Sequence, residues 1–280
     1  MPSERLQATH ASAGASAAMS GDSRGGFDWV LPDWPAPAGV RALSLRRTGG
    51  ISSGVYASLN LGDHVGDLAQ AVAENRRRLR TAAGLPSEPV WLRQVHGTAV
   101  ADLDQGEPAG AHGLTGAQGA TGGHDAAVAR RPGRICAILT ADCLPVLFAA
   151  ADGSAVGAAH AGWRGLAAGV LPATIHALGV APEGLLSWIG PGIGPQHFEV
   201  GPEVREALLG LDPAGVDCFT ANTRGRFLAD LPALARRQLA ALRVGSIGGS
   251  HECTYGHPER YFSHRRDGAC GRQATLIWLE

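Results

Sequence analysis

The sequence predicts a single mixed α+β domain in which β-sheets are flanked by helices. Two observations lead to this class. Short apolar runs suited to buried strands alternate with amphipathic stretches of helical period, and no internal repeat or linker interrupts residues 27–280. The length of 280 residues is compatible with one large domain that buries a sizeable core.

The first predicted helix lies within residues 67–84. Its period places Leu68, Val72 and Leu79 on one face. Three further helices are predicted at residues 163–178, 201–210 and 232–242. Pro172 is expected to bend the first of these three, because its ring removes one hydrogen bond of the helical ladder.

Six apolar runs are predicted to form strands. Each is short and bounded by glycine, proline or polar residues, a pattern typical of buried strands. The runs are residues 89–96, 134–140, 145–150, 154–160, 184–190 and 273–279.

Two segments are predicted to lie outside the core. Residues 1–26 are small and polar without apolar periodicity, so we expect a disordered tail, because such a segment buries too little apolar surface to offset the entropy of ordering. Residues 104–124 are rich in glycine and alanine and are expected to form a surface loop inserted between strands.

Charge and hydropathy narrow the class of partner. The formal net charge is −1 and the isoelectric point is about 6.8, so electrostatics give no reason to expect a nucleic acid or an anionic membrane as partner. No apolar run reaches the length of a membrane-spanning helix, and the N-terminal residues lack the pattern of a secretory signal. We expect a cytoplasmic protein that acts on a small molecule.

The cysteines argue against both a disulfide framework and a zinc ribbon. They are odd in number, widely spaced and without a C-x-x-C pair. At least one thiol is therefore expected to be free. The positions are Cys136, Cys143, Cys218, Cys253 and Cys270.

Three predicted strands end at side chains that can bind a metal. His96 comes just before Gly97, Cys143 shortly precedes Pro145, and His160 follows another apolar run. Two imidazoles and a thiolate at the ends of strands in one sheet would suit Zn²⁺, leaving the fourth position for water or substrate. Spacing alone leaves other roles open: Cys143 as a buried structural thiol or a nucleophile, and each histidine as a loop cap.

Several stretches together resemble the YfiH-like laccase-domain family. They are "RRTGGISSGVYASLNLGDHVGD", "RQVHG", "TADCLPVLF", "AAHAGWRG", "IGPGIGPQHFEVG" and the C-terminal "ECTYGHPERYFSHRRDGACGRQATLIWL". They occur in order from about residue 40 to residue 280.

The resemblance implies a fold, a metal site and an activity. Family members are described as polyphenol oxidases and as purine nucleoside phosphorylases with added adenosine deaminase activity. The expected fold is one α+β catalytic domain over residues 27–280, and the matching motifs imply that His96, Cys143 and His160 bind zinc. The implied reactions are phosphorolysis of adenosine, inosine or methylthioadenosine and deamination of adenosine. The expected partners are thus a purine nucleoside and phosphate.

Phosphorolysis requires a cation that holds phosphate, and the planar fork of arginine suits this role. Arg47, Arg265 and Arg266 lie in matching motifs beside glycine-rich turns, and Arg164 follows His160 in "HAGWRG". Each could instead be an exposed charge or a member of an ion pair, so the phosphate-binding arginines stay open at this point.

Deamination requires an activated water and a group that moves a proton. A bound zinc ion lowers the pKa of water, and Asp142, next to Cys143, is the nearest candidate acid. Asp142 could equally orient a metal ligand. Asn60 could hydrogen-bond the nucleoside or shape a turn.

Three alternatives belong to other classes. A copper-dependent polyphenol oxidase needs many histidines, and this chain contains no H-x-H pair, although the same three donors could bind copper. A hydrolase that edits peptidoglycan precursors is a second alternative, taken from other members of the family. A non-enzymatic binding module is a third, which an open three-ligand metal site disfavours.

Overall fold

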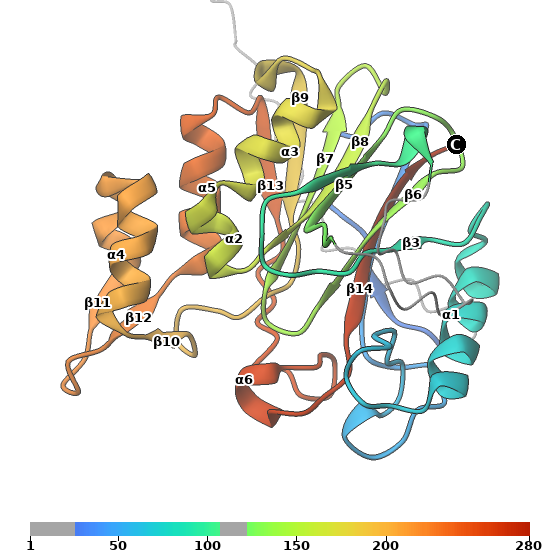
Figure 1. The fold of residues 1–280 in the computed structure, drawn as a ribbon, viewed down its shortest axis with the longest axis horizontal. Helices are drawn as coiled ribbons and strands as arrows, with labels where there is room; N and C mark the ends of the chain where they lie inside the picture. Colours follow the sequence, from blue (N-terminus) through green and yellow to red (C-terminus); the bar gives the residue numbers. More distant parts are fainter. Residues whose placement is uncertain (1–25, 107–121) are drawn as a thin grey trace, which may run out of the picture.

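Two β-sheets lie face to face at the centre of the fold, and helices cover their outer faces (Figure 1). The structure is a computed structural model that describes residues 26–106 and 122–280. Residues 1–25 of the predicted tail and residues 107–121 of the predicted loop lie outside the described residues.

The first sheet has five strands in the order β1-β2-β14-β6-β3. Its pairs are antiparallel except for β3 and β6, which run parallel. The strands are β1 (Trp29–Val30), β2 (Val40–Leu45), β3 (Val90–Trp91), β6 (Ile135–Thr140) and β14 (Gln273–Leu279).

The second sheet has six strands in the order β13-β9-β7-β8-β5-β4. Parallel pairs occur at both edges, β13 with β9 and β4 with β5, and the pairs between them are antiparallel. The strands are β4 (Val100–Asp102), β5 (Ala126–Ala129), β7 (Leu144–Ala150), β8 (Val156–Ala161), β9 (Leu185–Ile189) and β13 (Ser246–Gly249).

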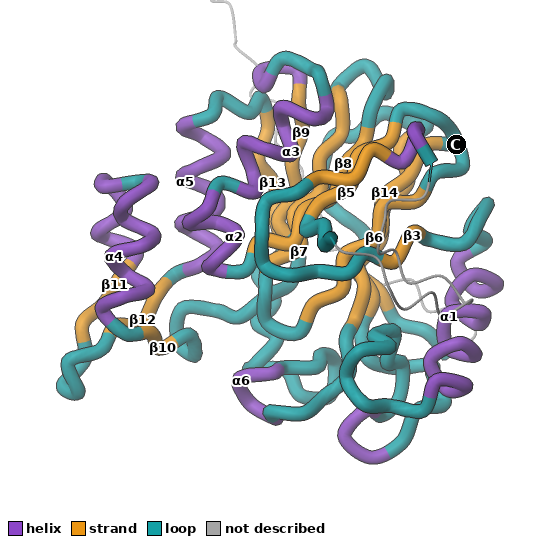
Figure 2. Tube along the Cα trace, in the orientation of Figure 1, coloured by secondary structure: helices purple, strands orange, loops and turns teal. Residues whose placement is uncertain are grey.

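A smaller three-stranded sheet projects to one side together with helix α4 (Figure 2). Its strands are β10 (Glu199–Val200), β11 (Phe219–Ala221) and β12 (Phe227–Ala229). The helices are α1 (Ala69–Ala83), α2 (Trp163–Ala168), α3 (Val170–Leu178), α4 (Pro202–Leu211), α5 (Leu231–Ala241) and α6 (His264–Asp267). None of these helices, within the residues described, has the length and apolar character needed to cross a bilayer.

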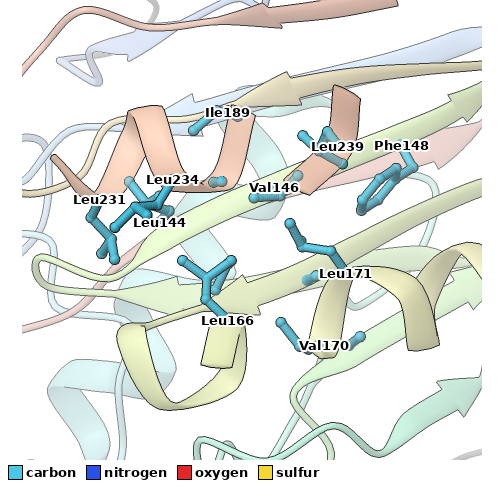
Figure 3. Packing of buried hydrophobic residues seen from close by; sticks show 14 of the residues in the cluster. Leu144, Val146, Phe148, Leu166, Val170, Leu171, Ile189, Leu231, Leu234 and Leu239 are labelled. Carbon is cyan, nitrogen blue, oxygen red and sulfur yellow. The ribbon is translucent and has the colours of Figure 1, made fainter. Parts of the chain in front are cut away.

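Alternation along β6 explains the layered core. Ile135, Ala137 and Leu139 face the cluster under α1, whereas Cys136 and Ile138 face the layer between the two sheets. On the outer face of the second sheet, α2, α3 and α5 cover another apolar cluster (Figure 3). The result is four layers, helix–sheet–sheet–helix, and the predicted α+β class is confirmed.

The predicted helix over residues 163–178 is in fact two helices. The break lies at Gly169, whose φ of 92° is left-handed, and not at Pro172. Pro172 lies in the first turn of α3, where its missing N–H would have had no partner within the helix. Leu68 was also misplaced by the periodicity, because it precedes α1 and is 70% exposed.

The predicted strand over residues 89–96 pairs only at Val90–Trp91. Beyond it, the Gln94 side chain takes over the ladder: its Nε2 donates to Leu139 O at 2.8 Å and its Oε1 accepts from Leu139 N at 2.8 Å. The Gln94 side chain, and not the backbone of its own segment, bonds to β6 at this point. The chain can therefore turn away from the sheet just before His96.

Candidate metal centre and adjoining pocket

The structure brings His96, Cys143 and His160 together. One ligand atom from each lies within 4.8 Å of the others. Cys143 Sγ is 3.8 Å from His96 Nε2, and the two imidazole rings meet edge to face with centroids 4.7 Å apart. Within the described part of the chain, no other group of three or more His, Cys, Asp or Glu residues meets the same geometric condition.

The three residues do not come from one sheet, contrary to the prediction. His96 follows β3 of the five-stranded sheet, and His160 lies in β8 of the six-stranded sheet. Cys143 lies in the connection from β6 to β7, where the chain crosses between the sheets. The group therefore closes one end of the layer between the two sheets.

Left-handed backbone occurs both in the segment after β3 that contains His96 and in the connection from β6 to β7 that contains Cys143. His96 has a φ of 61° and Asp142 a φ of 93°, values that side chains other than glycine rarely adopt. Such strain persists only where surrounding contacts hold it, and it is common at functional sites. Here it lets the chain reverse direction beside each potential ligand.

Asp125, immediately before β5, organises two of the three ligands. Its buried Oδ1 lies 2.8 Å from His160 Nδ1 and accepts from His96 N, also at 2.8 Å. Its Oδ2 accepts from Gly97 N at 2.7 Å and Val95 N at 3.1 Å. Engagement of His160 Nδ1 leaves Nε2 to face a metal, the usual arrangement around a metal-bound histidine.

Charge coupling favours the ionised forms of Cys143, His160 and Asp125. Burial opposes ionisation of Cys143, but the His160 charge and hydrogen bonds from His160 and His96 outweigh it and lower the pKa of Cys143 to about 6. Burial likewise disfavours charged His160, yet Cys143 and Asp125 raise the pKa of His160 to about 9. Burial would raise the pKa of Asp125 too, but the His160 and amide hydrogen bonds hold it below its usual value. At neutral pH the pair is thus thiolate and imidazolium.

Gly162 permits this close assembly. A Cβ atom there would lie 2.7 Å from Cys143 Sγ and 3.1 Å from His96 Cδ2. Two imidazoles and one thiolate are the donors that zinc accepts, and copper accepts them as well. The residues present therefore fit a divalent metal with an open coordination position.

A pocket adjoins the three ligands. Its lining includes Arg164 and Arg272, which form no ion pair with a carboxylate in residues 26–106 or 122–280. Two partly exposed arginines beside a metal group favour an anionic ligand. The other polar lining residues are His64, Gln94, Thr140 and His264.

Asp142 is not among the residues that line this pocket. Its Oδ1 accepts from Thr254 Oγ1 at 2.7 Å, and its Oδ2 accepts from Arg265 N at 2.7 Å. Its backbone carbonyl accepts from Ile193 N at 2.8 Å. The structure thus shows Asp142 as a buried anchor that ties the Cys143 connection to the C-terminal segment.

Asn60 shapes a turn beside the pocket. Its fully buried amide pairs with both backbone groups of Gly62 at 3.0 Å and donates to Asp67 Oδ2 at 2.9 Å. Its Oδ1 also accepts from Arg272 N at 2.9 Å. Asn60 therefore helps to position Arg272, and its own amide hydrogen bonds are made within the protein.

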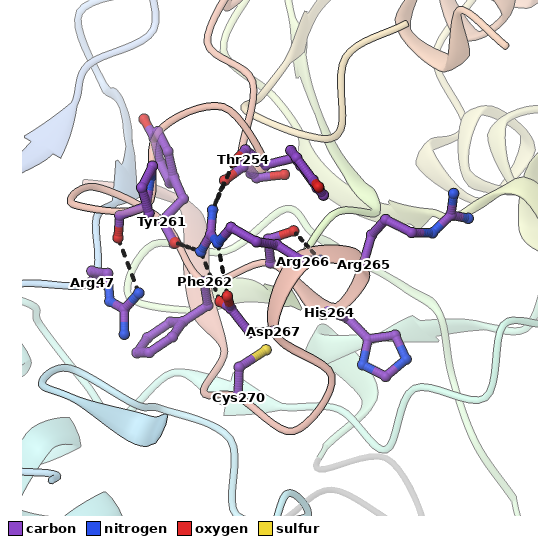
Figure 4. Close-up of polar contacts among 12 residues, drawn as sticks. Arg47, Thr254, Tyr261, Phe262, His264, Arg265, Arg266, Asp267 and Cys270 are labelled. Atoms are coloured by element: carbon purple, nitrogen blue, oxygen red, sulfur yellow. Dashed lines mark hydrogen bonds and ion pairs between the residues drawn. The ribbon is translucent and has the colours of Figure 1, made fainter. Parts of the chain in front are cut away.

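Arg265 and Arg266, predicted to bind phosphate, are occupied by other groups, and Figure 4 shows those that hold Arg266. Arg266 pairs with Asp267 and donates to the carbonyls of Thr254, Tyr255 and Tyr261 at 2.8–2.9 Å. Arg265 donates to the carbonyl of Glu199 at 2.8 Å. Neither side chain is among the lining residues of the pocket.

Arg47 and Arg164 differ in their surroundings. Arg47 donates to the carbonyls of Ala57 at 2.8 Å and Pro258 at 3.0 Å, and its guanidinium lies over the Phe262 ring (Figure 4). Burial lowers the pKa of Arg47 from its ordinary value. Arg164 is exposed, stacks over the Trp163 ring at 4.4 Å and lines the pocket.

Three residues at the site have no role predicted from the sequence: Asp125, Thr140 and Arg272. Arg272 NH1 donates to the carbonyls of Cys270 and Gly271, both at 2.9 Å, which anchors the guanidinium at the pocket. No local pattern in the sequence marks these residues as part of the site.

Comparisons with known proteins show the family of this chain. Residues 41–280 match the family described as "Multi-copper polyphenol oxidoreductase laccase". "Purine nucleoside phosphorylase YfiH" from Escherichia coli is 48% identical over 250 residues, covering 89% of this chain and 98% of that protein. "Purine nucleoside phosphorylase PA4543" from Pseudomonas aeruginosa is 47% identical over 253 residues, covering 90% and 98%.

Solved structures show the same fold. Neisseria meningitidis protein NMB0706 is 44% identical, with a TM-score of 0.82 over 90% of this chain and 99% of that one. YlmD from Geobacillus stearothermophilus is 33% identical, with a TM-score of 0.84 over 94% and 99%. With its His96–Cys143–His160 group at the end of two packed sheets, the chain belongs to the YfiH-like laccase-domain family.

Proposed function

We propose that this protein is a zinc-dependent purine nucleoside phosphorylase that also deaminates adenosine and cleaves methylthioadenosine. The observation that carries the proposal is the three-ligand group beside a pocket with two arginines that lack carboxylate partners in the described residues. Relatives at 47–48% identity named as purine nucleoside phosphorylases support it.

His96, Cys143 and His160 would hold the metal, with Asp125 behind His160. A bound zinc ion supplies a Lewis acid that polarises a substrate oxygen or activates water. The thiolate–imidazolium pair gives up the His160 proton on loading, so Cys143 serves as a ligand and not as a free nucleophile.

Arg164 and Arg272 are proposed to hold phosphate. Each can donate two hydrogen bonds to phosphate oxygens and so orient one of them toward the anomeric carbon of the ribose. Their positive charge stabilises phosphate as it approaches the developing oxocarbenium ion. Arg47, Arg265 and Arg266 are assigned structural roles instead, because none of them lines the pocket and their donors engage carbonyls or Asp267.

Asp142 is proposed to position the Cys143 connection and not to carry the proton in deamination. Both carboxylate oxygens already accept hydrogen bonds, and the side chain is 8% exposed. Asn60 is likewise proposed to act through the turn that presents Arg272.

The decisive experiment is an adenosine assay with a phosphate titration on zinc-loaded protein. We expect adenine and ribose 1-phosphate to form in proportion to phosphate, and inosine to form without it. Cys143→Ala should lose the metal and both reactions, whereas Cys218→Ala, a buried cysteine outside the site, should keep them. Absence of all three products with the wild-type protein would exclude the proposed activity.

A copper-dependent polyphenol oxidase remains the second candidate, since the matching family is described by that activity and the same donors bind copper. A multicopper centre needs additional histidines, and the described residues contain only one three-ligand group. Oxygen uptake with a phenolic substrate separates the two: copper-loaded protein that consumes oxygen but does not cleave adenosine would favour the oxidase.

A further inference from the structure

Thr140 carries a buried hydroxyl without a hydrogen-bond partner. In residues 26–106 and 122–280, only two buried side-chain polar atoms lack a partner, Thr140 Oγ1 and Gln238 Oε1. Gln238 still donates through Nε2 to Leu166 O at 3.4 Å, whereas the hydroxyl is the only polar group of the Thr140 side chain. Thr140 is only 2% exposed, and native proteins rarely leave such a group unpaired without a reason.

The position of Thr140 in β6 shows on which face of the sheet its side chain lies. Thr140 is the last residue of β6, on the same face as Cys136 and Ile138, which lie in the layer between the sheets. His160 enters that layer from β8, on the same face as Ala158. Thr140 and His160 both line the metal-site pocket, so the unpaired hydroxyl belongs to a residue of the pocket wall.

The chain on either side of Thr140 adds apolar side chains to the pocket. Leu139 and Ala141 precede and follow Thr140, and both line the pocket. The arginines assigned to phosphate have different surroundings, since Arg164 is exposed and Arg272 is partly exposed. A neutral hydrogen-bonding group of the substrate fits the apolar part of the pocket beside Thr140, whereas the phosphate anion fits the part beside the two arginines.

We propose that Thr140 Oγ1 hydrogen-bonds the purine nucleoside and is a specificity-determining residue of the pocket. The inference rests on the proposed function and deepens it. An unpaired buried hydroxyl is unfavourable in the free protein, and a ligand that pairs it restores the missing interaction on binding. A site built this way discriminates against analogues that lack the matching group.

The test compares zinc-loaded Thr140→Val and Thr140→Ser with the wild type. Valine keeps the shape and removes the hydroxyl, whereas serine keeps the hydroxyl. For Thr140→Val we expect kcat/KM for adenosine to fall about tenfold, the size of one typical hydrogen bond, while KM for phosphate stays within about twofold. Its Tm should equal or exceed the wild-type value, because the unpaired group is gone. Thr140→Ser should retain wild-type kinetics.

Thr174→Val is the matched control. Thr174 is also fully buried, but its hydroxyl donates to Val170 O at 2.7 Å inside α3, away from the pocket. We expect a lower Tm and unchanged kinetics. Unchanged kcat/KM for adenosine in Thr140→Val would overturn the role proposed for Thr140, as would a lower Tm with adenosine and phosphate kinetics affected alike. Neither result would overturn the proposed function. A wild-type protein that neither binds nor cleaves adenosine would overturn the proposed function, and this inference with it.

Discussion

At the scale of single residues, Asp125 controls the metal group without being one of its ligands. One buried carboxylate contacts Nδ1 of His160 and accepts from the amides of Val95, His96 and Gly97. Histidine ligands bind metal well only when the second ring nitrogen is held in this way. The precision of the site therefore depends on Asp125 as much as on the ligands.

Replacement of Asp125 by asparagine should weaken zinc binding by about 10- to 100-fold, because the amide carries no charge to support His160. Competition with a chromophoric chelator measures the affinity, and circular dichroism checks the fold. Asp212→Asn, which removes a partner of Arg237 outside the site, should leave zinc affinity unchanged. Wild-type affinity in Asp125→Asn would contradict the role assigned to this carboxylate.

Zinc binding should also depend on pH through Cys143 and His160. In the metal-free protein the lowered pKa of Cys143 (about 6) and the raised pKa of His160 (about 9) leave one proton on the pair at neutral pH. Loading at about pH 7.5 should therefore release about one proton, which comes from His160. Release should approach zero above about pH 9, where His160 is already neutral. It should rise above one below about pH 6, where Cys143 is protonated as well.

Calorimetry in buffers of different ionisation enthalpy measures this release. His176→Gln provides a control, because His176 lies in α3 and outside the metal group. A proton release that stays constant from pH 5.5 to 9.5 would show that the pair does not titrate as described.

At the scale of secondary structure elements, the turn from β8 into α2 is built for close approach. Gly162 caps α2 with an ordinary extended backbone, φ −68° and ψ 164°. Its lack of a side chain, not an unusual conformation, lets the chain pass beside Cys143 and His96. His160 and Arg164 thus flank a point where no Cβ atom fits.

Gly162→Ala should lower zinc affinity by at least about tenfold with little change in secondary structure, since the new methyl group overlaps Cys143 Sγ and even small displacements of ligands weaken binding. Gly210→Ala is the control: nothing lies within 4 Å of the added Cβ, and alanine in α4 should stabilise the protein by about 0.5–1 kcal/mol. Zinc titration and thermal unfolding measure both effects. Equal zinc affinity in the two variants would rule out the proposed overlap.

At the scale of the whole molecule, the site exists only because two sheets pack against each other. His96 depends on the first sheet and His160 on the second, and the layer between them contains Ile138, Leu147 and Trp188. Apolar burial in that layer is the main force that holds the two sheets together. Packing far from the metal group therefore sets the distances within it.

Leu147→Ala should lower the free energy of unfolding by about 2–5 kcal/mol, because Leu147 is fully buried between the sheets. Zinc at about 100 times its Kd should restore about 2.7 kcal/mol by mass action, and Cys143→Ala should show no such gain. Denaturant unfolding with and without zinc measures both the loss of unfolding free energy in Leu147→Ala and the gain on adding zinc. Leu68→Ala, at a side chain that is 70% exposed, should have little effect; a similar loss there would contradict the account of the core.

Much of the fold was predictable because its signals are local. Strands β6, β7, β8, β9 and β14 are apolar runs with clear boundaries, and α1 has an amphipathic repeat. The prediction omitted strands β1, β2, β4, β5 and β10 to β13, and it did not divide the strands between sheets. Strands that pair can lie far apart along the chain, as β14 and β2 do. Short-range periodicity therefore does not predict which strands pair.

For the site, the sequence by itself determined the chemistry of the donors. The ordered motifs marked His96, Cys143 and His160, and the structure places their ligand atoms together. Only the tertiary structure decided which other side chains face them: Arg272 in place of Arg265 and Arg266, and Asp142 directed toward Thr254. A motif records the type of a residue, but the direction of its side chain depends on contacts distant in sequence that form only when the two sheets pack.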